Sequence, residues 1–232
     1  MNLKTLLWPE ICPFCFKASA GGICKECRKK TDGLRIRGPV CLKCGKPVRY
    51  KEQEYCHDCG HTYHYYDRGA ALWLHREPVS TSVYRFKYQN QRVFAKYYAG
   101  EMAAHMGELV RRWRPEVLVP VPLHPRRRRK RGYNQAALLA RELGKQWGIP
   151  VGKNLVRRVR YTEPQKELSP GNRKKNLESA FAPGRAGQMP RSVLVIDDIY
   201  TTGSTADAVA KVLKEAGVQK VYFLCISIGQ GY

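Results

Sequence analysis

The sequence lacks the long apolar runs that a membrane protein needs. Its 232 residues contain no run approaching the ~18 consecutive apolar residues of a membrane-spanning helix, so no membrane span is predicted. The apolar stretch at residues 3–8 is too short for a secretory leader, and no cleavage-site pattern follows it. We therefore expect a cytoplasmic protein.

Acidic residues are scarce as well. Nineteen Asp and Glu stand against 42 Lys and Arg, which gives a formal net charge of +23 and a pI near 9.9. This excess attracts a polyphosphate chain and exceeds what one small anionic ligand needs. We therefore predict nucleic-acid binding, and we expect it to be independent of sequence because no recognition helix of a known DNA-reading class is visible. The plain alternative is a basic surface that only favours solubility.

The basic charge is concentrated in two short blocks, at residues 126–131 and 173–175. Three tyrosines near these blocks would offer stacking faces for unpaired bases. The predicted nucleic-acid-binding residues are Arg126, Arg127, Arg128, Arg129, Lys130, Arg131, Arg173, Lys174 and Lys175, with Tyr133, Tyr161 and Tyr200 as stacking faces.

The common nucleotide-binding signatures are missing, because the chain has neither a Walker A loop nor a GxGxxG fingerprint. A different phosphate site is predicted where the apolar run 193–196 ends in Asp197 and Asp198. A turn of small and hydroxyl residues at 201–205 then leads into a helix, so free N–H groups and the helix dipole favour an anion there. The two acids would repel a bare phosphate but would accept hydrogen bonds from ribose hydroxyls, directly or through Mg²⁺.

This segment is therefore predicted to bind a ribose 5-phosphate. The alternative is an ordinary connection in which Asp and Thr cap the helix. Two adjacent acids followed by five small or hydroxyl residues exceed what capping requires. The candidate residues are Asp197, Asp198, Thr201, Thr202, Gly203, Ser204 and Thr205.

Eight of the nine cysteines form four Cys-x-x-Cys pairs, and two such pairs complete a closed tetrahedral Zn²⁺ shell. Two structural zinc sites are predicted, and disulfides are disfavoured in a cytosolic chain. Pairing of neighbours gives one site from Cys12, Cys15, Cys24 and Cys27 and another from Cys41, Cys44, Cys56 and Cys59. Interleaved pairing stays open. The ninth cysteine, Cys225, is predicted to be a buried thiol, and His57, His61 and His64 are treated as surface residues.

After the last cysteine pair, predicted strands alternate with predicted helices. Strands are expected at 70–74, 117–119, 155–159, 193–196 and 221–226, with helices at 94–113 and 136–147. This alternation indicates an α/β fold with a parallel sheet covered on both faces and ligands at the carboxyl ends of the strands. We predict a zinc module at residues 1–66 and an α/β domain at 67–232 with a separate core.

The acid pair and turn resemble the phosphoribosyl pyrophosphate (PRPP) motif of type I phosphoribosyltransferases. Together with the cysteine pairs, the whole chain resembles the ComF family of competence proteins. The more specific matches are Phe86-Lys87-Tyr88, Arg131-Gly132-Tyr133-Asn134-Gln135, and the ordered positions Arg160, Thr162, Gln165, Leu168, Arg173, Asn176, Ala180 and Phe181.

The resemblance implies a double zinc-ribbon module before a type I phosphoribosyltransferase-like domain. It implies that Asp197 and Asp198 meet the ribose hydroxyls and that residues 201–205 wrap the 5-phosphate. The segment 120–125 takes the place of the pyrophosphate loop, although its three prolines depart from the donor-rich form. The segment 161–176 takes the place of the loop that closes over PRPP.

Two functions follow from this reading. The first is a DNA-uptake protein of natural transformation that binds imported single-stranded DNA beside a helicase-like competence protein, with the zinc module serving structure or partner docking. The alternative is a Mg²⁺-dependent PRPP transferase with an unidentified acceptor. The residues assign no catalytic group and leave catalysis open.

Overall fold

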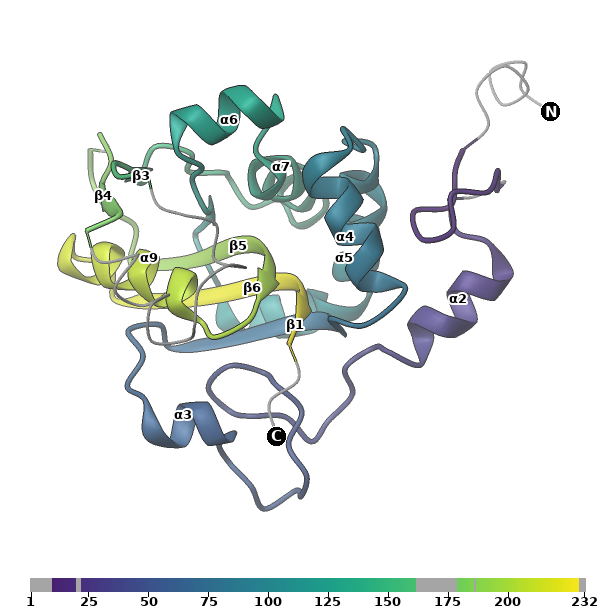
Figure 1. Ribbon diagram of the computed structural model, residues 1–232. Coiled ribbons are helices and arrows are strands. Elements are labelled where there is room, and N and C mark those ends of the chain that lie inside the picture. Colours follow the sequence, from purple (N-terminus) through teal and green to yellow (C-terminus); the bar gives the residue numbers. More distant parts are fainter. Residues whose placement is uncertain (1–9, 20–21, 162–178, 186, 230–232) are drawn as a thin grey trace.

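The computed structural model describes residues 10–19, 22–161, 179–185 and 187–229 (Figure 1). Its centre is a sheet of four parallel strands in the order β1-β6-β5-β2. These strands are β1 (Arg68–Leu74), β2 (Val117–Pro120), β5 (Ser192–Tyr200) and β6 (Lys220–Ile228). The predicted parallel α/β fold is confirmed.

Helices cover both faces of the sheet (Figure 1). Three of them, α4 (Val79–Tyr88), α5 (Phe94–Trp113) and α7 (Gln135–Trp147), share a core with Leu194 and Ile196 of β5. The opposite face packs on α9 (Ser204–Glu215), whose core includes Val193 and Val195 of the same strand. Successive side chains of β5 thus enter different cores, which explains why this strand reads as a continuous apolar run.

Two smaller features lie outside the sheet. Helix α6 (Pro125–Arg131) follows β2, and Figure 1 shows it next to α7. The strand predicted at 155–159 is found as β3 (Val156–Arg158), but it pairs in antiparallel fashion with β4 (Phe181–Pro183) as a separate two-stranded sheet.

The cysteine-rich segment packs against the α/β domain through both of its halves. The first half carries α2 (Lys25–Asp32), and its Phe14 ring makes edge contacts with Trp73 of β1 at 5.9 Å and Tyr97 of α5 at 5.8 Å. Ser82 of α4 donates a hydrogen bond to the Pro13 carbonyl oxygen at 2.6 Å. This half covers the face of the sheet that carries α4 and α5.

The second half carries α3 (His57–His61) and covers the other face. Gly45 adopts a φ of +76° and lies so close to β1 that a Cβ there would be 2.7 Å from the Gly69 carbonyl oxygen. Between the halves, the Ile36 N–H donates to Leu72 O and the Leu74 N–H donates to Leu34 O, which adds a short antiparallel segment to the β1 edge.

The expectation that the α/β domain has a separate core is therefore wrong. Buried cysteines of both halves belong to the same hydrophobic clusters as the sheet residues. The reason is compositional: the segment has few Leu, Ile and Val residues of its own, so it buries its apolar side chains against the sheet. The proposed boundary at residue 66 stays a prediction.

None of the helices within residues 10–19, 22–161, 179–185 and 187–229 combines the length and the hydropathy that crossing a membrane requires.

Candidate functional site

A cavity of about 620 Å³ opens at the carboxyl ends of the strands. Asp197 and Asp198 of β5 line it, together with Thr201 and Thr205 of the following turn. The sequence predicted that strand β5 ends at residue 196, whereas it continues to Tyr200. The cavity wall also carries five cationic side chains and two tyrosines, namely Lys87, Arg127, Lys130, Arg131, Arg158, Tyr88 and Tyr161.

Asp198 is buried, and both of its carboxylate oxygens have partners. Its Oδ1 lies 2.8 Å from Nζ of Lys87 on α4, and its Oδ2 accepts a hydrogen bond from Nε2 of Gln135, the first residue of α7, at 2.8 Å. Lys87 belongs to the sequence match at 86–88, and Gln135 belongs to the match at 131–135. These two sequence features therefore meet at one acid of the predicted PRPP motif.

Asp197 has a different environment. Burial and the neighbouring charge of Asp198 raise the pKa of Asp197 to about 7, although Lys87 and Arg158 oppose this shift. Burial and the proximity of Arg127 lower the pKa of Arg158 to about 10, which leaves its guanidinium charged at neutral pH. The cavity therefore combines charged cationic groups with one carboxyl group that ionises near neutrality.

The turn at 201–205 contains a glycine that the geometry requires. Gly203 has a φ of +80° and is the N-cap residue of α9, and a Cβ at this position would lie 2.3 Å from the Tyr200 hydroxyl oxygen. The hydroxyls of Thr202 and Ser204 are 2.8 Å apart. In the part of the chain that the structure describes, no side chain forms a capping hydrogen bond at the start of α9. The alternative in which Asp and Thr cap this helix is therefore wrong.

The basic block at 126–131 forms helix α6, which begins after His124 and ends at Gly132. Three of its side chains, Arg127, Lys130 and Arg131, line the cavity, while Arg126, Arg128 and Arg129 face solvent. The second basic block, Arg173, Lys174 and Lys175, lies outside the described residues, as do Gln165 and Asn176 of the same segment.

Of the three tyrosines proposed as stacking faces, only Tyr161 is accessible. Its side chain is 48% exposed, and the guanidinium groups of Arg126 and Arg127 lie 5.7 and 5.6 Å from its ring. The prediction is wrong for Tyr133, which is buried and donates a hydrogen bond to Phe86 O. It is also wrong for Tyr200, which is buried and stacks on Phe223 at 4.7 Å.

A second exposed tyrosine at the cavity was missed. Tyr88 of α4 is 52% exposed, and the guanidinium group of Arg131 lies 4.7 Å from its ring. Tyr84, one turn earlier, is also exposed and lies 4.9 Å from Tyr88. The sequence contains a signal for this pair, because two tyrosines four residues apart lie on the same face of a helix, and the buried positions of this helix lie on another face.

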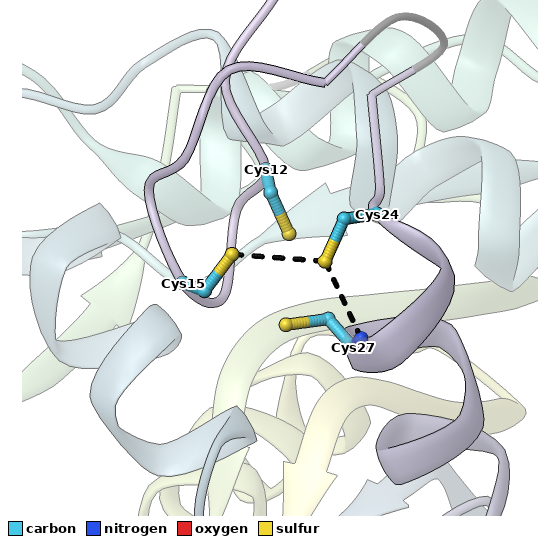
Figure 2. Close-up of side chains that lie close together, drawn as sticks. All are labelled: Cys12, Cys15, Cys24 and Cys27. Atoms are coloured by element: carbon cyan, nitrogen blue, oxygen red, sulfur yellow. Dashed lines mark hydrogen bonds between the residues drawn. The ribbon is translucent and has the colours of Figure 1, made fainter.

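The eight paired cysteines form two clusters in sequential order. Within each cluster all four sulfurs lie within 4.8 Å of one another, which excludes the interleaved arrangement. Figure 2 shows the first cluster, formed by Cys12, Cys15, Cys24 and Cys27. The Sγ atoms of Cys15 and Cys24 are 3.7 Å apart, and those of Cys44 and Cys56 are 3.6 Å apart. Tetrahedral zinc with Zn–S bonds of ~2.3 Å places sulfurs ~3.8 Å apart. Both clusters therefore fit a closed, structural zinc site.

The remaining thiol and histidine predictions have mixed outcomes. Cys225 is buried, as expected, and all nine cysteines lack disulfide bonds. His57 and His61 are exposed, whereas His64 is buried. The surface assignment of His64 is wrong because its ring stacks on Tyr66 at 4.8 Å and lies 3.5 Å from Asp207 of α9.

Comparison with known domain families agrees with this architecture. The double zinc ribbon domain matches residues 3–60, and the phosphoribosyl transferase domain matches residues 129–228. The chain is thus a phosphoribosyltransferase-fold protein with a double zinc ribbon.

Similar proteins specify the family. The chain is 35% identical over 208 residues to competence protein F of Haemophilus influenzae, which covers 86% of this chain and 87% of that protein. It is 30% identical over 230 residues to DNA utilization protein YhgH of Salmonella typhimurium, covering 97% and 98%. It is 25% identical over 205 residues to competence protein ComFC of Bacillus subtilis, covering 84% and 79%. The chain belongs to the ComF family of competence proteins.

Proposed function

We propose that this chain is a cytoplasmic DNA-uptake protein of natural transformation that binds single-stranded DNA through its phosphoribosyltransferase-like domain. The observation that carries the proposal is the rim of the cavity, where basic side chains of α6 lie between two exposed tyrosines, Tyr88 and Tyr161. The names of the similar competence and DNA-utilization proteins support a role in handling imported DNA.

The rim suits an unpaired strand better than a duplex. Basic side chains that follow a phosphate chain and aromatic rings that stack on bases are the two elements of sequence-independent single-strand binding. The rings of Tyr88 and Tyr161 each lie under an arginine of α6, with guanidinium-to-ring distances of 4.7 to 5.7 Å. The bases of a duplex are stacked on each other, so they have no free face for these rings.

Within the cavity, the turn at 201–205 binds a ribose phosphate, either PRPP or a sugar phosphate of the DNA itself. The uncapped start of α9 supports this assignment, because its N–H groups remain available to an anion. Two bound Zn²⁺ ions hold the cysteine-rich segment against the sheet, and the exposed side of that segment is available to a helicase-like partner. The alternative function is a PRPP transferase, which the same turn and acid pair favour.

Removing the rim tyrosines tests the proposal. Tyr88→Ala and Tyr161→Ala should each weaken binding of a single-stranded oligonucleotide by about tenfold, which is the loss expected when one base loses its stacking partner. Duplex binding should change little, because phosphate contacts dominate it. Fluorescence anisotropy with labelled single-stranded and duplex DNA measures both.

The matched control is Tyr50→Ala, because Tyr50 is 66% exposed on the cysteine-rich segment. It should leave both affinities unchanged. If the rim variants lost affinity equally for single-stranded and for duplex DNA, the tyrosines would not stack on bases, and the proposed binding mode would fail.

The pH dependence of DNA binding should reflect Asp197. Since its pKa is raised to about 7, the carboxyl group is mostly neutral at pH 6 and negatively charged at pH 8. DNA phosphodiesters do not titrate in this range, so single-strand affinity should fall roughly threefold from pH 6 to pH 8 as the new charge repels them. Asp197→Asn should flatten this change and bind more tightly than the parent at pH 8.

Asp197→Asn also separates the two functions. A DNA-binding protein should keep its transformation activity with this variant, whereas a transferase needs the acid to hold the ribose while charge develops at the anomeric carbon. Loss of transformation in a competent host, with folding and DNA binding intact, would favour the transferase.

A further inference from the structure

We propose that Lys87 takes the place of a divalent cation in the cavity, so that the cavity binds a ribose phosphate without Mg²⁺. The inference rests on the proposed ribose-phosphate binding and specifies how it occurs. Mg²⁺ is the ion expected to bridge a PRPP-type ligand and the acid pair, so the first question is whether the residues present fit this ion.

The residues around Asp198 do not fit Mg²⁺. Mg²⁺ requires near-octahedral oxygen ligands at ~2.0–2.1 Å and gives up its water shell reluctantly. Here a lysine ammonium lies 2.8 Å from Oδ1, and the amide of Gln135 donates to Oδ2 at 2.8 Å. An approaching dication would meet the positive charge of Lys87 on one oxygen and amide hydrogens on the other.

Both members of the Lys87–Asp198 ion pair are held in place, so separating them is unfavourable. The side chains of Lys87 and Asp198 are 18% and 6% exposed. Lys87 follows Phe86, which is fully buried in the core beneath α4. Separating Lys87 from Asp198 would leave a buried carboxylate without its counter-charge, which is strongly unfavourable. The ammonium therefore neutralises Asp198 permanently, as a bound metal would do.

The rest of the cavity supplies what a ribose phosphate needs. The cationic side chains of Arg127, Lys130 and Arg131 line the same wall and compensate the charge of a phosphate. The Oε1 atom of Gln135 is buried and has no hydrogen-bond partner among the described residues, so it can accept a hydrogen bond from a ribose hydroxyl. Lys87 and Gln135 together replace the metal-bridged contact with a protein contact.

The experiment measures binding of ribose 5-phosphate and of PRPP to the full chain by isothermal titration calorimetry, with and without Mg²⁺. Magnesium is removed by dialysis rather than by a strong chelator, because a chelator would also strip zinc from the cysteine clusters. The parent should bind equally well in both buffers. Lys87→Met should weaken binding without Mg²⁺ by about tenfold or more, the loss expected for one charged hydrogen-bonding partner. Added Mg²⁺ should restore part of this loss.

Two further variants keep the test decisive. Lys130→Met removes one positive charge from the same wall, and it should weaken binding equally in both buffers. Lys87→Met with Asp198→Asn leaves no uncompensated buried charge, so it should fold even if the single variant does not. In this double variant Mg²⁺ should restore less binding than in Lys87→Met, because only Asp197 of the acid pair is left to bind the ion.

The outcomes separate this inference from the function on which it rests. Binding by the parent only in the presence of Mg²⁺ would overturn the role of Lys87 and leave the ribose-phosphate site standing. Unchanged magnesium-free binding by Lys87→Met, with the fold verified by circular dichroism, would overturn it as well. Absence of ribose-phosphate binding in both buffers would overturn the site itself, whereas single-strand binding, measured on the same samples, would be unaffected.

Discussion

Replacing Cys44 by serine should reduce the zinc content from two ions per chain to one and destabilise the whole chain. A structural zinc site contributes about 10–16 kcal/mol in isolated zinc-finger peptides, so loss of the ion should cost at least about 3–4 kcal/mol here. For a chain of this size that corresponds to a fall in Tm of about 10 °C. Elemental analysis and thermal unfolding followed by circular dichroism measure the two effects.

The effect should extend to the α/β domain because of where Cys44 lies. Its side chain is fully buried in the same cluster as Ala71 of β1 and Phe223 of β6, under the face of the sheet that also carries α9. Loss of zinc there removes the support of one face of the sheet. A single cooperative transition at lower temperature is therefore expected, rather than separate unfolding of the cysteine-rich segment.

Cys15→Ser is the matched control, because it removes one ligand of the first cluster at an exposed position. It should also cost one zinc ion, with a smaller fall in Tm. If Cys44→Ser lost its zinc while the α/β domain unfolded at the parent's temperature, the shared core would not be important for stability. A parent protein without zinc would overturn the assignment of both clusters.

The features predicted correctly from the sequence are those encoded locally. Two cysteines separated by two residues specify a metal knuckle within four positions. The acid pair and its turn occupy nine consecutive residues of one strand-to-helix connection. The continuous apolar run at 193–196 indicated a strand buried on both faces. These signals depend on short-range geometry, so they require no knowledge of the tertiary structure.

The errors concern contacts between distant segments. The contacts of Asp198 with Lys87 and Gln135, which lie 111 and 63 positions earlier in the chain, were not predicted, whereas its contact with a ribose stays a prediction. Tyr133 and Tyr200 were proposed as stacking faces because they lie near basic residues in sequence, but their amphipathic rings are buried in the core. The same applies to His64, whose ring is covered by Tyr66 and the start of α9. Proximity along the chain does not determine which face a side chain takes.

Neutralising the exposed basic residues of α6 should weaken single-stranded DNA binding more than any other surface change. Arg126, Arg128 and Arg129 face solvent and Lys130 is an exposed residue of the cavity wall, so replacing all four by glutamine should leave the fold intact. If each contacts one phosphate, the log–log salt slope should fall by about 2.8 for a single strand, and the affinity at physiological salt should fall about 100-fold. Anisotropy titrations across a salt series give both quantities.

The matched control loses the same charge elsewhere. Replacing Lys25, Lys29, Lys51 and Arg111 by glutamine removes four exposed basic residues from α2, from the cysteine-rich segment and from α5. A protein that attracts DNA only through its net charge of +23 would respond equally to both quadruple variants. If the binding surface is localised, the α6 variant should lose much of its affinity for DNA. The control variant should lose little affinity and should keep the log–log salt slope of the parent. Equal responses would mean that α6 is only a solvent-exposed basic helix. A loss of affinity confined to the α6 variant would instead place the DNA strand at the rim of the cavity, between Tyr88 and Tyr161.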